Sequence, residues 1–133
     1  MRKITLALLV FIVAPVVALA SPFKYETCNL GWEHVHHDHN EESYQQAWCN
    51  AHQGILEYEN KDFTRVDCLT SVHAVEFDFA NKWAESVGQA LHYSLMTGKK
   101  AKVVLILDNS KQMVYYKRVQ KLADKYHFEV EYV

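Results

Sequence analysis

The sequence predicts an α/β domain with a mixed central sheet flanked by helices. Two kinds of pattern lead to this expectation. Three segments repeat apolar residues at helical spacing, and five shorter segments are rich in β-branched and aromatic residues. Along the chain these segments follow the order αβββαβαβ, so three strands come in succession before helices and strands alternate.

The first predicted helix begins at Asn40 and is followed by three strands. Asn40 can cap the helix, Glu41 and Glu42 suit the positive end of its dipole, and Gly54 supplies a stop. The three strand-like runs, which are separated by turn-prone residues, are 55–59, 64–69 and 72–79. Short connections of this kind predict an antiparallel meander.

The second half of the domain alternates helices with strands. Residues 80–97 form an amphipathic helical pattern, and Gly98 follows as a C-terminal signal. The apolar run at 102–108 is typical of a strand that is buried on both faces, hence near the sheet centre. A helix from about Lys111 to Tyr126 follows, and the alternating sequence FEVEYV predicts a final edge strand.

The N-terminus has the layout of a secretory signal peptide. Arg2 and Lys3 precede an apolar run from Ile4 to Ala20, which ends in the small-residue sequence Ala-Leu-Ala. Cleavage would remove residues 1–20, and we expect an exported protein, periplasmic or secreted, with no stable membrane association afterwards. An uncleaved membrane anchor is the alternative, although the run is short for a spanning helix.

Residues 21–39 show no sustained period and predict an irregular, histidine-rich arm. Four histidines and an aspartate lie within the six residues from His34 to His39. Neutral imidazole is a preferred ligand of Zn²⁺, Cu²⁺ and Ni²⁺, so this cluster could bind such an ion. No CxxC or HExxH spacing accompanies it, and an exposed arm without a fixed metal is the alternative.

Three cysteines follow the predicted cleavage site, in a compartment where thiols tend to pair. We expect a disulfide between Cys49 and Cys68, which would tie the first helix to a central strand and leave Cys28 over. Pairing of Cys28 with Cys49 remains open.

The charge of the chain is unevenly distributed. Without Arg2 and Lys3 the chain has 12 basic and 16 acidic residues, which gives no general affinity for polyanions. Residues 21–81 hold 3 basic and 11 acidic side chains, whereas residues 82–133 hold 9 basic and 5 acidic ones. An acidic cation site beside a basic, anion-binding surface would explain this split, and so would two ordinary solvated faces.

Three carboxylates stand in strongly apolar strand sequence. Glu76 and Asp78 are two residues apart and therefore share one face of their strand. If the two strands pair through the short turn, Asp67 joins them on that face. Like charges at such distances repel unless a cation lies among them, and carboxylate oxygens suit a hard divalent cation such as Mg²⁺.

The helix after these strands carries a polar band. At 100° per residue, four side chains fall within roughly 60° of each other on a different side from the apolar stripe: Lys82, Ser86, Gln89 and Tyr93. The band is either a solvated face or a set of groups directed at the carboxylates.

Together these residues resemble the PD-(D/E)xK nuclease superfamily, which has the restriction-endonuclease-like fold, and within it the Holliday-junction-resolvase-like branch. The resemblance covers residues 40–133. It implies that Asp67 and Glu76 bind Mg²⁺ or Mn²⁺, that Glu42 or Glu41 is the first-helix carboxylate, and that Gln89 is the helix glutamine of the branch. Nucleic acid is the partner that it implies.

One position departs from the family pattern. Asp78 stands where the family has its lysine, and Lys82 is the residue that could replace this lysine from the helix. The candidate catalytic residues are therefore Asp67, Glu76, Asp78, Lys82 and Gln89. We expect an exported metal-dependent nuclease or phosphodiesterase. The alternative is a catalytically inactive relative that serves as a binding protein or metal-binding protein.

Overall fold

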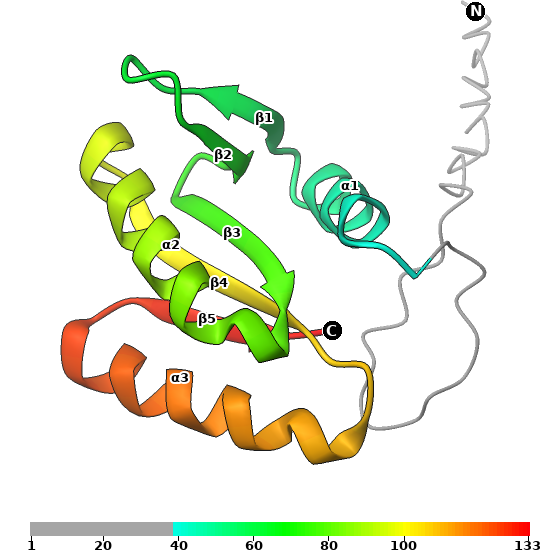
Figure 1. The fold of residues 1–133 in the computed structure, drawn as a ribbon. Coiled ribbons are helices and arrows are strands. Elements are labelled where there is room, and N and C mark those ends of the chain that lie inside the picture. The colour runs from blue at the N-terminus through cyan, green and yellow to red at the C-terminus, as the bar shows by residue number, and fades with distance from the viewer. Residues whose placement is uncertain (1–38) are drawn as a thin grey trace, which may run out of the picture.

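The computed structural model describes residues 39–133, which form a five-stranded mixed sheet flanked by three helices (Figure 1). The helices and strands are, in order, α1 (Glu41–Ala51), β1 (Ile55–Glu59), β2 (Arg65–Leu69), β3 (His73–Phe79), α2 (Trp83–Thr97), β4 (Lys100–Ile106), α3 (Met113–Tyr126) and β5 (Glu129–Tyr132). Short 3₁₀ turns, η1 (Ala80–Lys82) and η2 (Ser110–Gln112), precede α2 and α3. The predicted order of elements is confirmed. The expected signal peptide, Cys28 and His34–Asp38 lie outside the described residues.

The strands lie in the order β1-β2-β3-β4-β5 across the sheet. Strands β1, β2 and β3 form the expected antiparallel meander, whereas β4 runs parallel to both β3 and β5. Two crossovers, one through α2 and one through α3, make these parallel pairings possible, because parallel neighbours need a long connection. As expected, β4 has strand partners on both sides and β5 is an edge strand.

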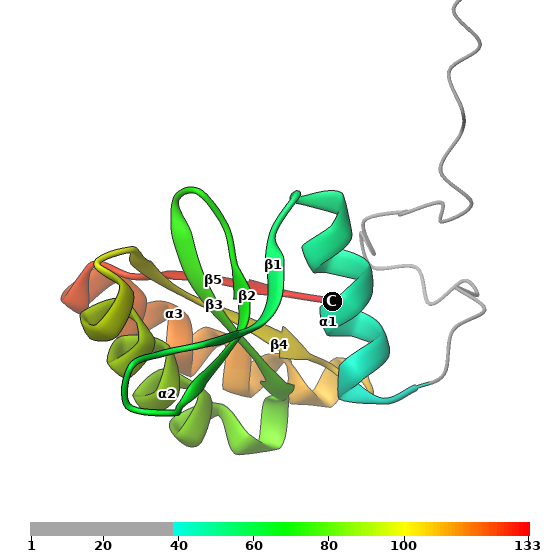
Figure 2. The same cartoon turned by 90° about the horizontal axis from the view of Figure 1, so that it is seen from above.

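The sheet has a hydrophobic core on each face (Figure 2). On one face Val103 and Leu105 of β4 pack with residues of α2 and α3. On the other face Val104 packs with Val75, Phe77 and residues of α1. Since alternate side chains of a strand point to opposite faces, β4 serves both cores.

The helix ends show how local sequence sets the elements. Asn40 caps α1, because its Oδ1 accepts a hydrogen bond from the Ser43 amide at 2.9 Å. Gly98 ends α2 in the left-handed conformation, with φ 69°. α1 ends at Ala51, three residues before the expected stop at Gly54, and the left-handed residue is Gln53, with φ 54°. The Gly54 amide still closes the helix end, because it donates to the backbone oxygen of Cys49 at 2.9 Å. A Cβ at Gly54 would lie 2.3 Å from Cys68 Sγ, so this glycine also leaves room for the sulfur atoms.

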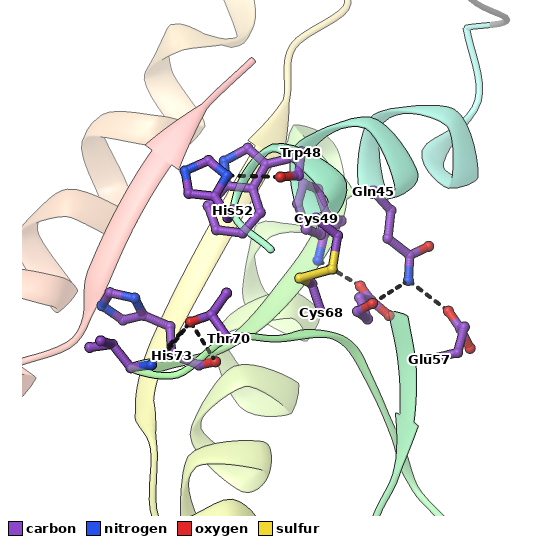
Figure 3. The surroundings of a disulfide bond; sticks show 11 residues. Gln45, Trp48, Cys49, His52, Glu57, Cys68, Thr70 and His73 are labelled. Carbon is purple, nitrogen blue, oxygen red and sulfur yellow. Dashed lines mark hydrogen bonds between the residues drawn. A yellow bond between two sulfur atoms is a disulfide. The ribbon is translucent and has the colours of Figure 1, made fainter. Parts of the chain in front are cut away.

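The expected disulfide between Cys49 and Cys68 is present and joins α1 to β2 (Figure 3). Both cysteines are fully buried in the core under α1. The alternative pairing of Cys28 with Cys49 is therefore not the one that forms. A disulfide is consistent with an exported protein. In residues 39–133 no helix has the length and apolar character needed to cross a membrane.

Candidate functional site

The candidate site begins where β2 and β3 diverge. The two strands pair only at Cys68 with Val75 and at Leu69 with Ala74. Beyond that point the backbone amide of Phe77 donates instead to Oδ2 of Asp67, at 2.7 Å. The Asp67 side chain thus takes the place of a backbone acceptor, which fixes its carboxyl group beside β3.

Glu76 and Asp78 lie on the sheet face that α2 and α3 cover. In the parallel register Glu76 is paired with Val103 and Asp78 with Leu105, both of which belong to the core on that face. Glu76 is 4% exposed and Asp78 is 3% exposed. Two carboxyl groups are therefore buried in line with core residues, where ionised groups need compensation.

The carboxyl groups of Asp67 and Glu76 are in direct contact. Burial, followed by the charge of Asp67, raises the pKa of Glu76 well above its usual range, and burial likewise raises the pKa of Asp67. Within residues 39–133, Oε2 of Glu76 is buried and has no conventional hydrogen-bond donor. Two touching carboxyl groups can form a hydrogen bond only when one of them is protonated. The pair therefore needs either a shared proton or a cation.

Asp78 links the pair to two further charged residues. Lys82 Nζ lies 3.1 Å from Oδ1 of Asp78, and its side chain is 53% exposed, so the ammonium group reaches in from the surface. Glu41, at the start of α1, contacts Asp78, and burial and then the charge of Asp78 raise the pKa of Glu41. We refer to Glu41, Asp67, Glu76 and Asp78 as the carboxylate cluster.

The structure distinguishes the two glutamates at the start of α1. Glu41 belongs to the carboxylate cluster. Glu42 is exposed and lines a small hollow with Gln45, Gln46, Leu56 and Glu57. Of the two candidates for the first-helix carboxylate, Glu41 is thus the one that lies beside Asp78.

Sequence reasoning missed Gln45 and Glu57. Gln45 is buried, and its Nε2 donates to Oε1 of Glu57 at 2.6 Å and to the backbone oxygen of Asp67 at 2.9 Å (Figure 3). Glu57 has a φ of 50°, which is unusual for a residue other than glycine. Its charge contributes to the raised pKa of Asp67. The available signal was the position of Gln45 four residues before Cys49, which places both on one side of the helix.

The polar band of α2 is not a solvated face, because Ser86 and Tyr93 are buried. The Tyr93 hydroxyl donates to Oε1 of Gln89 at 3.2 Å. Burial, and then the charges of Glu76 and Asp67, raise the pKa of Tyr93. Gln89 is therefore connected to the carboxylate cluster through Tyr93, whereas Lys82 contacts it directly.

His39 is the residue of the histidine-rich arm that the structure describes. Its Nε2 lies 2.8 Å from Oδ1 of Asp108, and its Nδ1 lies 2.8 Å from the hydroxyl of Tyr44. Both ring nitrogens therefore contact the domain. Among the side chains of residues 39–133, no group of three or more His, Cys, Asp or Glu is arranged to hold a metal ion.

The fold and the site define an α/β domain with a cluster of four carboxyl groups, of which Glu76 and Asp78 are buried and Glu76 has an oxygen without a donor among residues 39–133. Comparison with protein-family models, curated proteins and solved structures finds no match to the chain. Its function therefore has to be inferred from the chemistry of the cluster.

Proposed function

We propose that this protein is an exported nuclease or phosphodiesterase that depends on Mg²⁺ or Mn²⁺ and acts on nucleic acid. The observation that carries the proposal is the contact between the half-buried carboxyl group of Asp67 and the buried one of Glu76, one of whose oxygens has no donor among the described residues. Burying such a pair costs stability, and a bound divalent cation would offset that cost.

The donor set suits a hard cation. Mg²⁺ is commonly held by one or two carboxylates and keeps several of its waters, so Asp67 and Glu76 would be sufficient protein ligands without a third side chain. Glu41, rather than Glu42, is the first-helix carboxylate that could support them, because it is the one in contact with Asp78. When bound, the ion would polarise the scissile phosphate and lower the pKa of water.

Two other side chains would act on the substrate. Lys82 reaches Asp78, the position that holds lysine in the PD-(D/E)xK pattern, and its ammonium group would stabilise negative charge on the phosphate. The hydrogen bond from Tyr93 fixes the oxygen side of the Gln89 amide. Its NH₂ side is then the donor available for a phosphate oxygen or an attacking water.

The arrangement of elements supports a restriction-endonuclease-like core. The order α1-β1-β2-β3-α2-β4 is the αβββαβ order of that fold, and it carries Asp67 on β2 and Glu76 on β3. The disulfide supports export, since such bonds persist in oxidising compartments.

The alternative is a catalytically inactive binding protein with the same fold. The observation that favours it is the ion pair between Lys82 and Asp78, because a lysine held by a buried carboxylate has less freedom to serve a phosphate. In that case the carboxylate cluster would bind a cation without performing hydrolysis.

A cleavage assay tests the proposal. The full exported chain is incubated with Mg²⁺ or Mn²⁺ on single-stranded, double-stranded and branched DNA and on RNA. We expect cleavage that Asp67→Asn and Glu76→Gln abolish and that the matched surface variant Glu42→Gln retains. If the unmodified chain cuts none of these substrates with either metal, the nuclease proposal fails and the binding protein takes its place.

A further inference from the structure

The exposed side of α3 carries four cations close together. Lys117, Arg118, Lys121 and Lys125 are all exposed, and at 100° per residue they fall within a band of roughly 100°. Lys111, also exposed, precedes the helix in η2. We call the surface formed by these five residues the basic face.

Three of the five acidic residues in this half of the chain contact groups outside the basic face, and the exposed Asp124 is the one acidic side chain on α3. Asp108 binds His39 and Gln112, whereas Glu129 and Glu131 pair with Lys102. No side chain of the basic face forms an ion pair with any residue from 39 to 133. Lys117, Lys121 and Lys125 also follow one another at i, i+4 spacing, which destabilises a helix when the charges are alike. The structure therefore bears a cost that an anionic partner would offset.

The apolar side of α3 is already occupied. Val119 and Ala123 are buried, and Tyr115, Tyr116 and Leu122 pack against the same core. A helix that binds a membrane surface inserts a continuous apolar face between the lipids, whereas the large apolar side chains that α3 leaves exposed, Val114 and Tyr126, lie at opposite ends of the helix. Charge is therefore the main feature available to a partner, which favours a hydrated polyanion over a membrane.

The basic face begins next to the carboxylate cluster. The guanidinium of Arg118 lies 5.8 Å from the ring centroid of Trp83, the first residue of α2. Trp83 directly follows Lys82, which contacts Asp78. A chain of phosphates lying along α3 would therefore arrive at the end of the sheet where the carboxylate cluster lies (Figure 1).

We propose that the basic face binds the phosphodiester backbone of a nucleic acid and guides it to the carboxylate cluster. This inference rests on the proposed function for its second half, whereas binding itself does not require catalysis. From Lys117 to Lys125 the helix rises about 12 Å, which is the length of three to four base-pair steps of duplex. Several cations can thus contact successive phosphates of one strand.

The test measures binding of the full exported chain to a fluorescein-labelled duplex DNA by anisotropy, in EDTA so that no cleavage occurs, over a range of salt concentrations. Each phosphate contact contributes about 0.9 to the slope of log affinity against log salt. The double variant Lys117→Gln/Lys121→Gln should lower the magnitude of that slope by about two. The matched control Lys61→Gln/Lys99→Gln changes the net charge equally, but Lys61 lies in the β1–β2 turn and the ammonium group of Lys99 contacts the backbone oxygen of Ser71 in the β2–β3 turn, away from α3. It should leave the slope within about one half of the original.

Three results would overturn the inference. The first is an equal change of the salt slope in the two double variants. The second is that the chain binds neither duplex DNA, nor single-stranded DNA, nor RNA. The third is that it binds phosphatidylcholine–phosphatidylserine vesicles in place of nucleic acid. The two proposals fail separately. If the chain binds DNA through α3 but cuts nothing with Mg²⁺, the binding proposal stands and the nuclease proposal fails. If the chain cuts equally well with and without Lys117 and Lys121, the nuclease proposal stands and the binding proposal fails.

Discussion

Strands β3 and β4 lie side by side and present opposite chemistry to the same helices. Val103 and Leu105 of β4 fill the core beneath α2 and α3, whereas their partners in register on β3 are Glu76 and Asp78. All four are buried to a similar extent. The β4 positions are explained by packing alone, but the β3 positions oppose it, because buried carboxyl groups cost stability. The difference is explained if β4 serves the fold and β3, as we propose, serves a site.

The largest expected effect is the loss of packing on β4. Leu105 is fully buried, so Leu105→Ala should lower the free energy of unfolding by about 2–5 kcal/mol. The matched control is Leu95→Ala on α2, where the side chain is 80% exposed and the change should be close to zero. Urea denaturation measures both. Similar losses at the two positions would contradict the assignment of β4 to the core.

Removal of the disulfide should have the next largest effect. Cys49 and Cys68 are 19 residues apart, and closing a loop of this size stabilises the folded state by about 3 kcal/mol in the loop-closure model. The double variant Cys49→Ala/Cys68→Ala should unfold at correspondingly lower urea concentration. Peptide mapping without reductant should identify the bond in protein from the exporting cell, and free thiols at both positions would refute it.

The carboxyl pair on the β3 side should behave in the opposite way from the core. The ordinary pKa values are 3.8 for Asp67 and 4.5 for Glu76, and both are raised in the folded protein. Below about pH 3 both groups are protonated in either state, so the full stability is present. As the pH rises, the unfolded chain releases these protons first, and stability falls until the folded-state pKa values are passed.

Glu76→Gln should therefore remove part of this pH dependence. At about pH 8 without metal the variant should be more stable than the unmodified chain, because the folded unmodified chain then has to keep a proton on Glu76 that the unfolded chain has released. At about pH 4 the two should be nearly equal. Thermal unfolding at both pH values measures this, and a variant that is less stable at pH 8 would show that Glu76 has a structural role instead.

The smallest expected change in stability is that on removal of Lys82. The same variant distinguishes an enzyme from a catalytically inactive relative. The Lys82 side chain is more than half exposed, so water screens the ion pair, and the buried carboxyl group of Asp78 keeps the Phe79 amide as a donor at 2.9 Å when Lys82 is removed. Lys82→Ala should therefore unfold close to the original, while the rate of cleavage falls and metal affinity stays nearly unchanged. A variant that cleaves at the full rate would exclude Lys82 from the site.

Local sequence was sufficient for the elements and for part of the site. The spacing of Glu76 and Asp78 predicts a shared face because the period of a strand is two residues. Local sequence does not show which of Glu41 and Glu42 lies near Asp78. These residues differ by about 100° around the helix, and the packing of α1 decides between them. Glu57 was missed for the same reason, because its position depends on Gln45 and on a φ of 50° that no local pattern predicts.

The measurement that tests the central claim most directly is titration calorimetry of the full chain with Mn²⁺ at about pH 8, where the folded pair has the greatest need of a cation. We predict saturable binding that Asp67→Asn and Glu76→Gln each remove, that Glu42→Gln retains, and that raises the melting temperature of the unmodified chain. No binding by the unmodified chain, or binding that survives both substitutions, would contradict the claim that β3 and Asp67 form a metal site.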